Sequence, residues 1–497
     1  MANLLESYKN RLTIAESVYS RAHEGEKMDQ HRKLVTARCL HNVNAFMTEA
    51  FDNSVGTQRS DMGMFKKFAL NLTTVALPNL IANDLVLVHP MTSMSGYISY
   101  IKYTTGSNKG GMSNGTENGT EATELFSPFK QGQVSEARTN YTSSKVEITS
   151  YTADTQLSWA PIVPRSVKAV IDGETYFDID GDGKLYKVTG SVALVTDSYG
   201  NVSISGTKDG NALAEATVNY EVGTISVGVD SLTYSYNNVI IPQNDIPVLN
   251  AELAAIPLMA KARRIAVYYS QIAAFQAKTD YGFDLGDQLA EKAVGELSYE
   301  IDTEVVNLLY KTAQEVTDEY VAAGKNTALV WNRTLPTGVS KAEHYEGFSE
   351  VIGVAGQYVY DRTQKFAPNY MVIASNIVPI LNFIKGWKAA PKGNVNGPYF
   401  AGTLDGLKVF VSPSIASGDF FLGVNGDDLM TSAAVYAPYM PIVPTQLLQY
   451  ADGGTSQGFS TLYDLKILNR DLLVAGHVDG VFGGVTGQTT GFMVTNA

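Results

Sequence analysis

The chain has 497 residues, of which 44% are hydrophobic, and its formal net charge at pH 7 is −13. This length predicts several folding units, the acidic balance argues against direct wrapping of nucleic acid, and no apolar run reaches the roughly 18 residues that a membrane span needs. The single cysteine, Cys39, excludes an internal disulfide framework and fits a reducing compartment.

The N-terminal region begins with residues 2–50, whose amphipathic pattern and balanced charge predict a helical arm or a packed helical pair. It contains no apolar signal region, so we expect no secretion through a signal peptide. A polar loop is expected at 51–61. Helical spacing then returns from Met64 and stops at Pro78, and the alternation at 85–89 predicts a buried strand.

A projecting β-ribbon is predicted next. From Gly96 the chain reads GYISYIKYT, which alternates as a β-strand does, and strand-like sequence resumes at Tyr141. Between Thr104 and Thr123 the chain is polar and rich in glycine. An ordinary surface loop would also account for this segment, but structureless loops of that length are uncommon in compact domains, which favours a ribbon with a long tip.

Residues 161–240 have a different character. Short β runs alternate with turn signals at a spacing of roughly ten residues, which predicts a small all-β sandwich or barrel. Pro161 and Pro164 lie at the start of the segment, and Pro242 and Pro247 follow it. This bracketing fits an inserted domain.

One motif within this segment has the spacing of a metal site. Asp178, Asp180 and Asp182 alternate before Gly183 in DIDGDGK, and such carboxylates can converge on Ca²⁺. The twelfth position of an EF-hand loop would be Thr189 rather than a glutamate, and flanking helices are missing. Because turns also favour aspartate and glycine, a solvated hairpin turn is the favoured interpretation, with calcium as the alternative and no other cofactor expected.

A long amphipathic helix is predicted from Asp284 to Val316, with Asp284 as its N-cap. Its apolar stripe comprises Leu285, Leu289, Ala293, Leu297, Ile301, Val305 and Leu309. Its opposite face carries Asp287, Glu291, Glu296, Glu300, Asp302 and Glu304. About 30 helical residues give a rod of roughly 45 Å, which needs a sheet or a neighbouring subunit along it.

After about Gly324 the pattern predicts an α/β lobe. We expect a helix at 346–366, a buried strand at 370–375, a short helix at 377–386 and two strands at 407–411 and 420–424. Two strand-like segments follow, at 433–444 and 459–478, and we expect them to return to the body that holds the long helix.

No catalytic set is evident in the sequence. The histidines are scattered and form no HExxH or Cys/His cluster; they are His23, His31, His41, His89, His344 and His477. Cys39 and His41 lie two residues apart in a predicted helix and therefore face different sides. A Walker A loop, a dinucleotide-binding glycine motif and a GxSxG elbow are also missing, so we predict that the protein is not an enzyme.

Three blocks of the chain resemble the T-even-type major capsid proteins of contractile-tailed phages. The first, at 68–91, reads FALNLTTVALPNLIANDLVLVHPM and resembles that family's proline-asparagine-leucine turn before a strand that ends in QPM or HPM. The second, at 261–309, resembles its basic strand and long helix, and the third, VYAPYMPIV at 435–443, resembles its YYAPYV strand. The blocks occur in family order, whereas 161–240 matches poorly.

The resemblance implies an α+β, Hong Kong 97-like capsid fold with an inserted all-β domain. Its expected parts, in chain order, are an N-terminal arm (1–60), the first part of the peripheral domain (61–95), an extended β loop (96–150) and the insertion (161–240). The peripheral domain with its spine helix (245–335), an axial α/β domain (336–432) and the peripheral return strands (433–497) follow.

The function implied is that of a major capsid protein of a tailed phage of the Caudoviricetes. Copies would self-assemble as hexamers and pentamers into the icosahedral head shell, in the bacterial cytoplasm, and enclose double-stranded DNA without sequence-specific binding. Vertex, portal and decoration proteins would be partners, and no membrane would be involved. The alternative is a carbohydrate-binding or adhesive surface protein built around the β insertion; a hydrolase is less favoured because no nucleophile–base pair is visible.

The resemblance also raises the question of trimming. In this family a protease often removes the arm after a glutamate that lies two residues beyond Ile or Leu. Glu6 and Glu16 match that pattern, and Glu49 matches it loosely. Because residues 2–50 have a balanced amphipathic pattern, we predict that the arm is retained.

Overall fold

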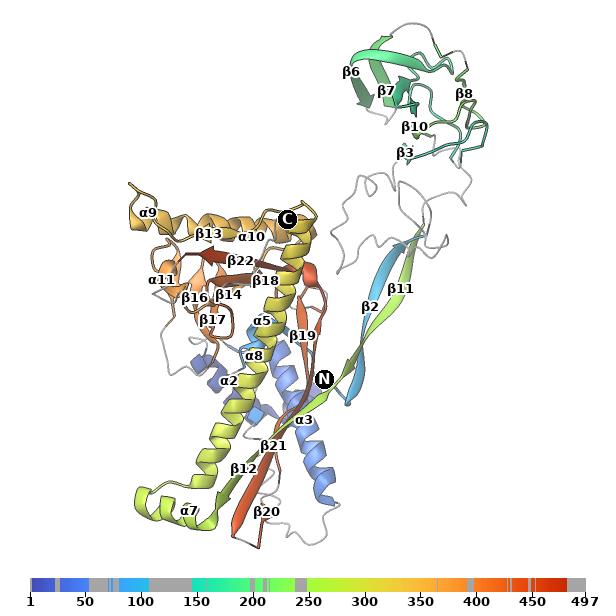
Figure 1. The fold of residues 1–497 in the computed structure, drawn as a ribbon. Coiled ribbons are helices and arrows are strands. Elements are labelled where there is room, and N and C mark those ends of the chain that lie inside the picture. Colours follow the sequence, from blue (N-terminus) through green and yellow to red (C-terminus); the bar gives the residue numbers. More distant parts are fainter. Residues whose placement is uncertain are drawn as a thin grey trace. The chain divides into compact units, whose positions relative to one another are not determined.

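The computed structural model contains both helices and sheets (Figure 1). It describes residues 2–22, 27–52, 70, 73–74, 80–106, 145–157, 159–196, 202–208, 212–213, 215–236, 248–363, 365–390, 397–426, 428–429, 431–445, 448–451 and 453–480. The chain divides into two compact units, one made of residues 1–99 and 255–497 and the other of residues 100–254. In the part described, no helix combines the length and the apolar character needed to cross a membrane.

The N-terminal helices of the first unit confirm the helical prediction for residues 2–50. They are α1 (Ala2–Ser7), α2 (Lys9–Ala22) and α3 (Gln30–Asp52). Helix α3 packs on strand β19 (Ala434–Pro444), and its Val35 and Cys39 are buried in the main hydrophobic core. Asn42 donates to the carbonyl oxygens of Met91 and Tyr439, so α3 is joined to the body by hydrogen bonds as well as by apolar contact.

A five-stranded sheet forms the next layer, in the order β1-β19-β21-β12 with β20 also pairing with β21. Besides β19, its strands are β1 (Leu87–Val88), β21 (Gly454–Ile467), β12 (Lys261–Ser270) and β20 (Leu448–Gln449). Strand β1 is parallel to β19, and the other neighbours are antiparallel. The short helix α5 (Ala82–Leu85) precedes β1, so the strand predicted at 85–89 begins later than expected.

Helix α8 (Leu285–Ala322) is the long helix that the sequence predicts, and it continues beyond Val316. Its first turn is capped because the Asp284 side chain accepts hydrogen bonds from the amides of Gly286 and Asp287, at 2.9 and 3.4 Å. With 38 residues it is about 57 Å long. Its buried stripe comprises Ala290, Ala293, Leu297, Ile301, Asp302, Val305, Val306, Leu309, Ala313, Val316 and Thr317. This stripe packs on β12, β21 and β22 (Leu473–Asp479).

A seven-stranded sheet has the order β13-β22-β18-β14-β17-β16-β15. The strands are β13 (Val330–Asn332), β22 (Leu473–Asp479), β18 (Asp419–Gly423), β14 (Tyr370–Ala374), β17 (Leu407–Ser412), β16 (Tyr399–Leu404) and β15 (Trp387–Ala389). Three helices accompany it, namely α9 (Lys341–Glu346), α10 (Phe348–Thr363) and α11 (Val378–Leu381). The buried strand predicted at 370–375 is confirmed, since every residue of β14 is buried.

The C-terminal strands return to the body that holds the long helix, and they divide between its two sheets. Strands β19 and β21 lie in the five-stranded sheet, whereas β22 lies in the seven-stranded sheet together with β13 and packs on α8. The physical reason is that β22 is buried from Leu473 to Val478, on both of its faces. Such a strand requires an internal position in a covered sheet, which α8 and α10 provide by packing against it.

The second unit contains a six-stranded sheet in the order β3-β10-β4-β5-β6-β7 and the short pair β8-β9. The strands are β3 (Lys145–Ile148), β4 (Lys168–Ile171), β5 (Glu174–Phe177), β6 (Tyr186–Thr196), β7 (Val202–Lys208), β8 (Val218–Asn219), β9 (Thr224–Ile225) and β10 (Ser231–Ser235). Trp159, Val167, Leu232 and Tyr234 belong to a hydrophobic core within this unit. Two residues with positive φ, Asp172 and Gly173, make the tight turn between β4 and β5.

The pairing of the ribbon also differs from the expectation. Strand β2 (Ser95–Thr105) pairs with β11 (Leu249–Met259), whereas β3, which follows Tyr141, belongs to the six-stranded sheet. Strands β2 and β11 have equal length, so they can pair throughout, and β3 is only four residues long. The expected ribbon tip beyond Gly106 lies outside the described residues, as does most of the helix expected from Met64 to Pro78.

Candidate functional site

The three aspartates of the predicted calcium loop lie in the second unit, and the first of them is a structural residue. Asp178 is fully buried. Its carboxylate accepts hydrogen bonds from the amides of Arg165 and Gly181, at 2.8 and 3.0 Å, and from the Tyr220 hydroxyl, at 2.6 Å. Burial and the bond to this carboxylate raise the pKa of Tyr220. Asp178 therefore has protein donors around both of its oxygens.

The other two aspartates turn to different partners. Asp180 forms an ion pair with Lys208, and Asp182 accepts from the Lys184 amide and the Tyr186 hydroxyl, each at 3.1 Å. No group of three or more potential metal-ligating side chains occurs among the described residues, these aspartates included. The geometry thus favours the hairpin-turn interpretation, and calcium binding stays a prediction.

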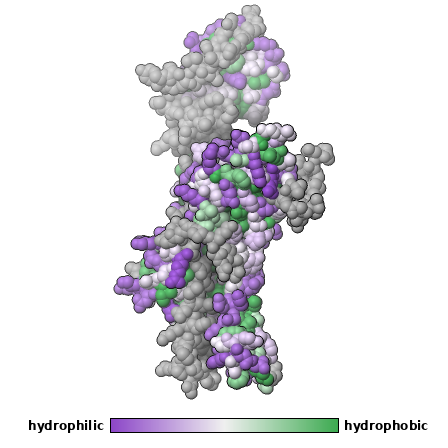
Figure 2. Space-filling model, turned by 90° about the vertical axis from the view of Figure 1, so that its left-hand side faces the viewer, coloured by the Kyte–Doolittle hydropathy of each residue, from purple (hydrophilic) through white to green (hydrophobic). Residues whose placement is uncertain are grey.

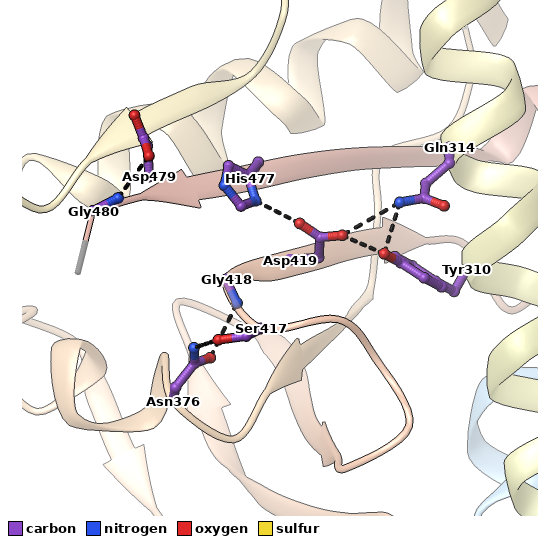
Figure 3. Close-up of polar contacts among 9 residues, drawn as sticks. All are labelled: Tyr310, Gln314, Asn376, Ser417, Gly418, Asp419, His477, Asp479 and Gly480. Carbon is purple, nitrogen blue, oxygen red and sulfur yellow. Dashed lines mark hydrogen bonds and ion pairs between the residues drawn. The ribbon is translucent and has the colours of Figure 1, made fainter. Parts of the chain in front are cut away.

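A buried polar cluster joins α8 to the seven-stranded sheet (Figure 3). His477 on β22 and Asp419 on β18 are both buried, and His477 Nδ1 lies 2.5 Å from Asp419 Oδ1. The other carboxylate oxygen accepts from the Tyr310 hydroxyl and from Gln314 Nε2. Burial and the neighbouring carboxylate raise the pKa of Tyr310. The cluster connects two strands to the long helix.

An Asp–His pair can serve catalysis when its histidine activates a nucleophile, and this pair lacks that arrangement. Among the described residues, the ring of His477 makes no hydrogen bond to a hydroxyl or thiol. The nearby Ser417 hydroxyl instead accepts from Asn376, whose side-chain oxygen accepts from the Gly418 amide (Figure 3). The sequence could not reveal this cluster, because His477 and Asp419 are 58 residues apart in the chain.

A second buried junction joins the N-terminal helices to α8. Asp302 on α8 accepts a hydrogen bond of 3.0 Å from the Ala82 amide, and Asp84 pairs with Arg32 of α3 at 2.8 Å. Burial raises the pKa of Asp302 to about 7. The negative charge of Asp84 adds to this rise, and hydrogen bonds from backbone amides oppose it. This corrects the sequence expectation, which placed Asp302 on the exposed acidic face. The i, i+4 pattern missed it because α5 covers that part of the helix.

A partly exposed ionic link connects β12 to the same helix. Arg263 pairs with Glu300 and Glu304, at 3.1 and 2.6 Å, and its guanidinium lies over the Tyr463 ring. The Tyr463 hydroxyl also donates to Glu304. Glutamates of the predicted acidic face therefore serve to fix a strand on the helix, in addition to facing solvent.

The ribbon presents apolar side chains to solvent. Ile101 and Leu253 are 50% and 78% exposed, and Tyr103 and Leu249 are exposed as well. Because the Gly106 amide donates to the Val248 carbonyl, counting along the antiparallel strands places Ile101 opposite Leu253 and all four side chains on one face. We call these four residues the ribbon face. Exposed apolar patches of this kind mark interaction surfaces.

The class of protein that these features define is a structural subunit. Its buried polar groups join elements of its own fold, and its exposed apolar side chains are available to other molecules. Comparison with known proteins agrees with this class. The family model described as major capsid protein Gp23 matches residues 62–472. The chain belongs to this family and is a major capsid protein of a tailed bacteriophage.

Individual relatives are distant in sequence. The major capsid protein of Enterobacteria phage T6 is 22% identical over 86% of this chain and 80% of its own length. That of Vibrio phage KVP40 is 24% identical over 42% of this chain and 43% of its own length, so that alignment spans less than half of the Vibrio phage protein. Among solved structures, the capsid of Myoviridae phage XM1 is similar over 49% of this chain and 81% of that chain, at 8% identity and a TM-score of 0.32.

Proposed function

We propose that copies of this chain assemble into an icosahedral head shell with a Hong Kong 97-like subunit, as hexamers and pentamers around double-stranded DNA. The ribbon face carries this proposal. Ile101 and Leu253 are exposed apolar side chains on a narrow two-stranded ribbon, and a two-stranded hairpin is only marginally stable alone in water. A neighbouring copy that covers this face would stabilise it and would supply the large contact area that permanent assemblies need.

The arrangement of elements supports the proposed subunit type. Helix α8 would be the spine helix, the five-stranded sheet the core of the peripheral domain, and the seven-stranded sheet the core of the axial domain. The six-stranded sheet of the second unit would be an inserted β domain, since it has a hydrophobic core of its own. The domain boundaries expected from the sequence remain part of this proposal.

The charge of the chain bears on what the shell encloses. The net charge of −13 supports enclosure of DNA without a sequence-specific grip, because an acidic surface repels the phosphate backbone. The shell assembles in the bacterial cytoplasm in this proposal, and vertex, portal and decoration proteins are its partners.

The purified full-length chain, viewed by negative-stain electron microscopy and analysed by sedimentation velocity, tests the proposal. We expect closed shells of megadalton mass. The variant Leu253→Asp should remain folded by circular dichroism but should not form shells, because it places a charge in an apolar contact. Val222→Asp is a matched control, since Val222 is an exposed apolar residue elsewhere in the same unit, at 47%. Shells formed equally well by Leu253→Asp would contradict the role of the ribbon face.

A further inference from the structure

Asp302 places a carboxyl group in the buried stripe of α8. It is only 8% exposed, and Ile301 and Val305 of the same stripe are 1% and 0% exposed. The hydrophilic residues on the face drawn in Figure 2 are solvated by water, whereas Asp302 is almost out of its reach. Because an ionised carboxylate loses much of its stabilisation when water is removed, this position favours the neutral carboxyl.

The segment that Asp302 contacts is itself joined to the N-terminal arm. The Asp302 carboxyl accepts a hydrogen bond of 3.0 Å from the Ala82 amide, at the start of α5. Two residues further on, Asp84 pairs with Arg32 of α3 at 2.8 Å, and Arg32 also donates to the Asn83 carbonyl at 3.0 Å. Helix α3 is therefore joined to α5, and α5 is joined to α8 through Asp302.

Within the described part of the chain, no cation compensates a negative charge at Asp302. Arg32 is engaged by Asp84, and Arg263 pairs with partly exposed glutamates of α8. The other titratable groups around Asp302 and the neighbouring Tyr436 ring are acids: Asp84 on α5, Cys39 on α3, Tyr436 on β19, Tyr463 on β21 and Glu304 on α8. Ionisation of Asp302 would therefore place a second negative charge beside Asp84.

We propose that protonation of Asp302 controls the N-terminal arm. The neutral carboxyl holds α5, and with it α3, on α8, and loss of the proton opens α3 and α5 together while the seven-stranded sheet stays folded. Helix α3 packs on β19 and on the other N-terminal helices, so it can separate without unpairing a strand of that sheet. This opening is a property of the single subunit and does not require shell assembly.

The closed and open arms differ in how tightly Asp302 holds its proton. Burial raises its pKa to about 7 in the closed state, whereas an exposed aspartate has a pKa of about 4. Closure is therefore most favourable below about pH 4 and weakens as the pH rises through about 7. His89, which follows β1, acts in the opposite direction below about pH 6.5, because burial and the neighbouring His31 of α3 lower its pKa.

The single cysteine of the chain tests the proposal. Cys39 lies on α3 and is fully buried, so a thiol reagent reaches it only when α3 opens. Full-length protein is treated with methyl methanethiosulfonate, and intact mass spectrometry measures the rate of labelling. After correction for the ionised fraction of an exposed thiol, the wild-type rate should rise about tenfold relative to that of Asp302→Asn between about pH 6 and 8.

The variants isolate the Asp302 proton. The asparagine of Asp302→Asn keeps an oxygen for the Ala82 amide but has no proton to lose, and the contribution of His89 is common to both proteins. Glu291→Gln removes a carboxylate from the exposed face of α8 and should follow the wild type. An equal dependence of Cys39 labelling on pH in the wild type and in Asp302→Asn would overturn the proposal.

Hydrogen exchange distinguishes opening of the arm from unfolding of the whole subunit. Over the same pH range, wild-type peptides from α3 and α5 should lose about tenfold in protection, whereas peptides from β14 should keep theirs. This comparison is made within the wild-type chain, so it does not depend on the folding of a variant. Protection that is lost equally from α3 and β14, or from neither, would exclude a separate opening of the arm.

Discussion

The seven-stranded sheet and the short helix α7 (Gln271–Gln276), which follows β12, use the same kinds of side chain in opposite ways. In the sheet, β14 and β18 are buried along their entire length, and α10 and α8 cover the neighbouring strand β22. In α7, Ile272 and Phe275 are more than two-thirds exposed on a capped and hydrogen-bonded backbone. The subunit thus completes a core without these residues. Changes at these two positions are therefore expected to affect the stability of the subunit much less than changes in the sheet.

The largest expected effect comes from a charge in the buried stripe. Ile301 is 1% exposed on α8, and Ile301→Asp should destabilise the subunit by several kcal/mol because the carboxylate would have no partner there. Ile272→Asp is the matched change at an exposed isoleucine and should leave the melting temperature within a few degrees of wild type. Thermal denaturation followed by circular dichroism measures both. A soluble Ile301→Asp protein with normal melting would show that the stripe is not buried.

The N-terminal arm offers a second test of the buried region, because α3 contributes side chains to the main core. Val35 and Cys39 are buried in the main core, and Asn42 bonds two backbone carbonyls of the body. Removal of α3 would leave a cavity and unsatisfied polar groups, so we expect the arm to be retained in assembled shells. Intact mass spectrometry of virion protein decides this. A mature chain that begins at Ser7, Ser17 or Ala50 would contradict retention of the arm.

A smaller, pH-dependent effect is expected at Asp302. Its pKa in the folded protein is about 7, above the value of about 4 expected for the unfolded chain. The folded state therefore binds its proton more tightly, so this stabilising contribution is complete below about pH 4 and is lost as the pH rises through about 7. Relative to Asp302→Asn, which keeps an oxygen for the Ala82 amide, the wild type should lose a few kcal/mol of unfolding free energy between about pH 5 and 8. Parallel pH profiles of the two proteins would exclude this linkage.

The smallest expected effect concerns the aspartate loop of the second unit. Because Asp178, Asp180 and Asp182 each bond different protein groups, addition of a chelator to the full-length protein should not change its melting temperature. Differential scanning calorimetry with and without calcium makes the measurement. A clear fall on chelation would support calcium binding at this loop.

The sequence by itself determined the elements whose patterns are local. The N-cap and four-residue apolar step of α8, the apolar run of β14 and the turn signals of the second unit each predict a structure that the chain adopts. These patterns need only short-range geometry, namely 3.6 residues per helical turn and two per strand repeat.

Only the tertiary structure decided which distant segments meet. The pairing of β2 with β11, the place of β22 in the seven-stranded sheet, the burial of Asp302 and the contact of His477 with Asp419 all join residues far apart in the chain. A strand pattern states that a strand needs a partner but carries no information on which strand supplies it, because backbone hydrogen bonds are alike in every strand. A carboxylate on a helix likewise reads as solvent-facing until another segment covers it, and that covering is a property of packing over the whole chain.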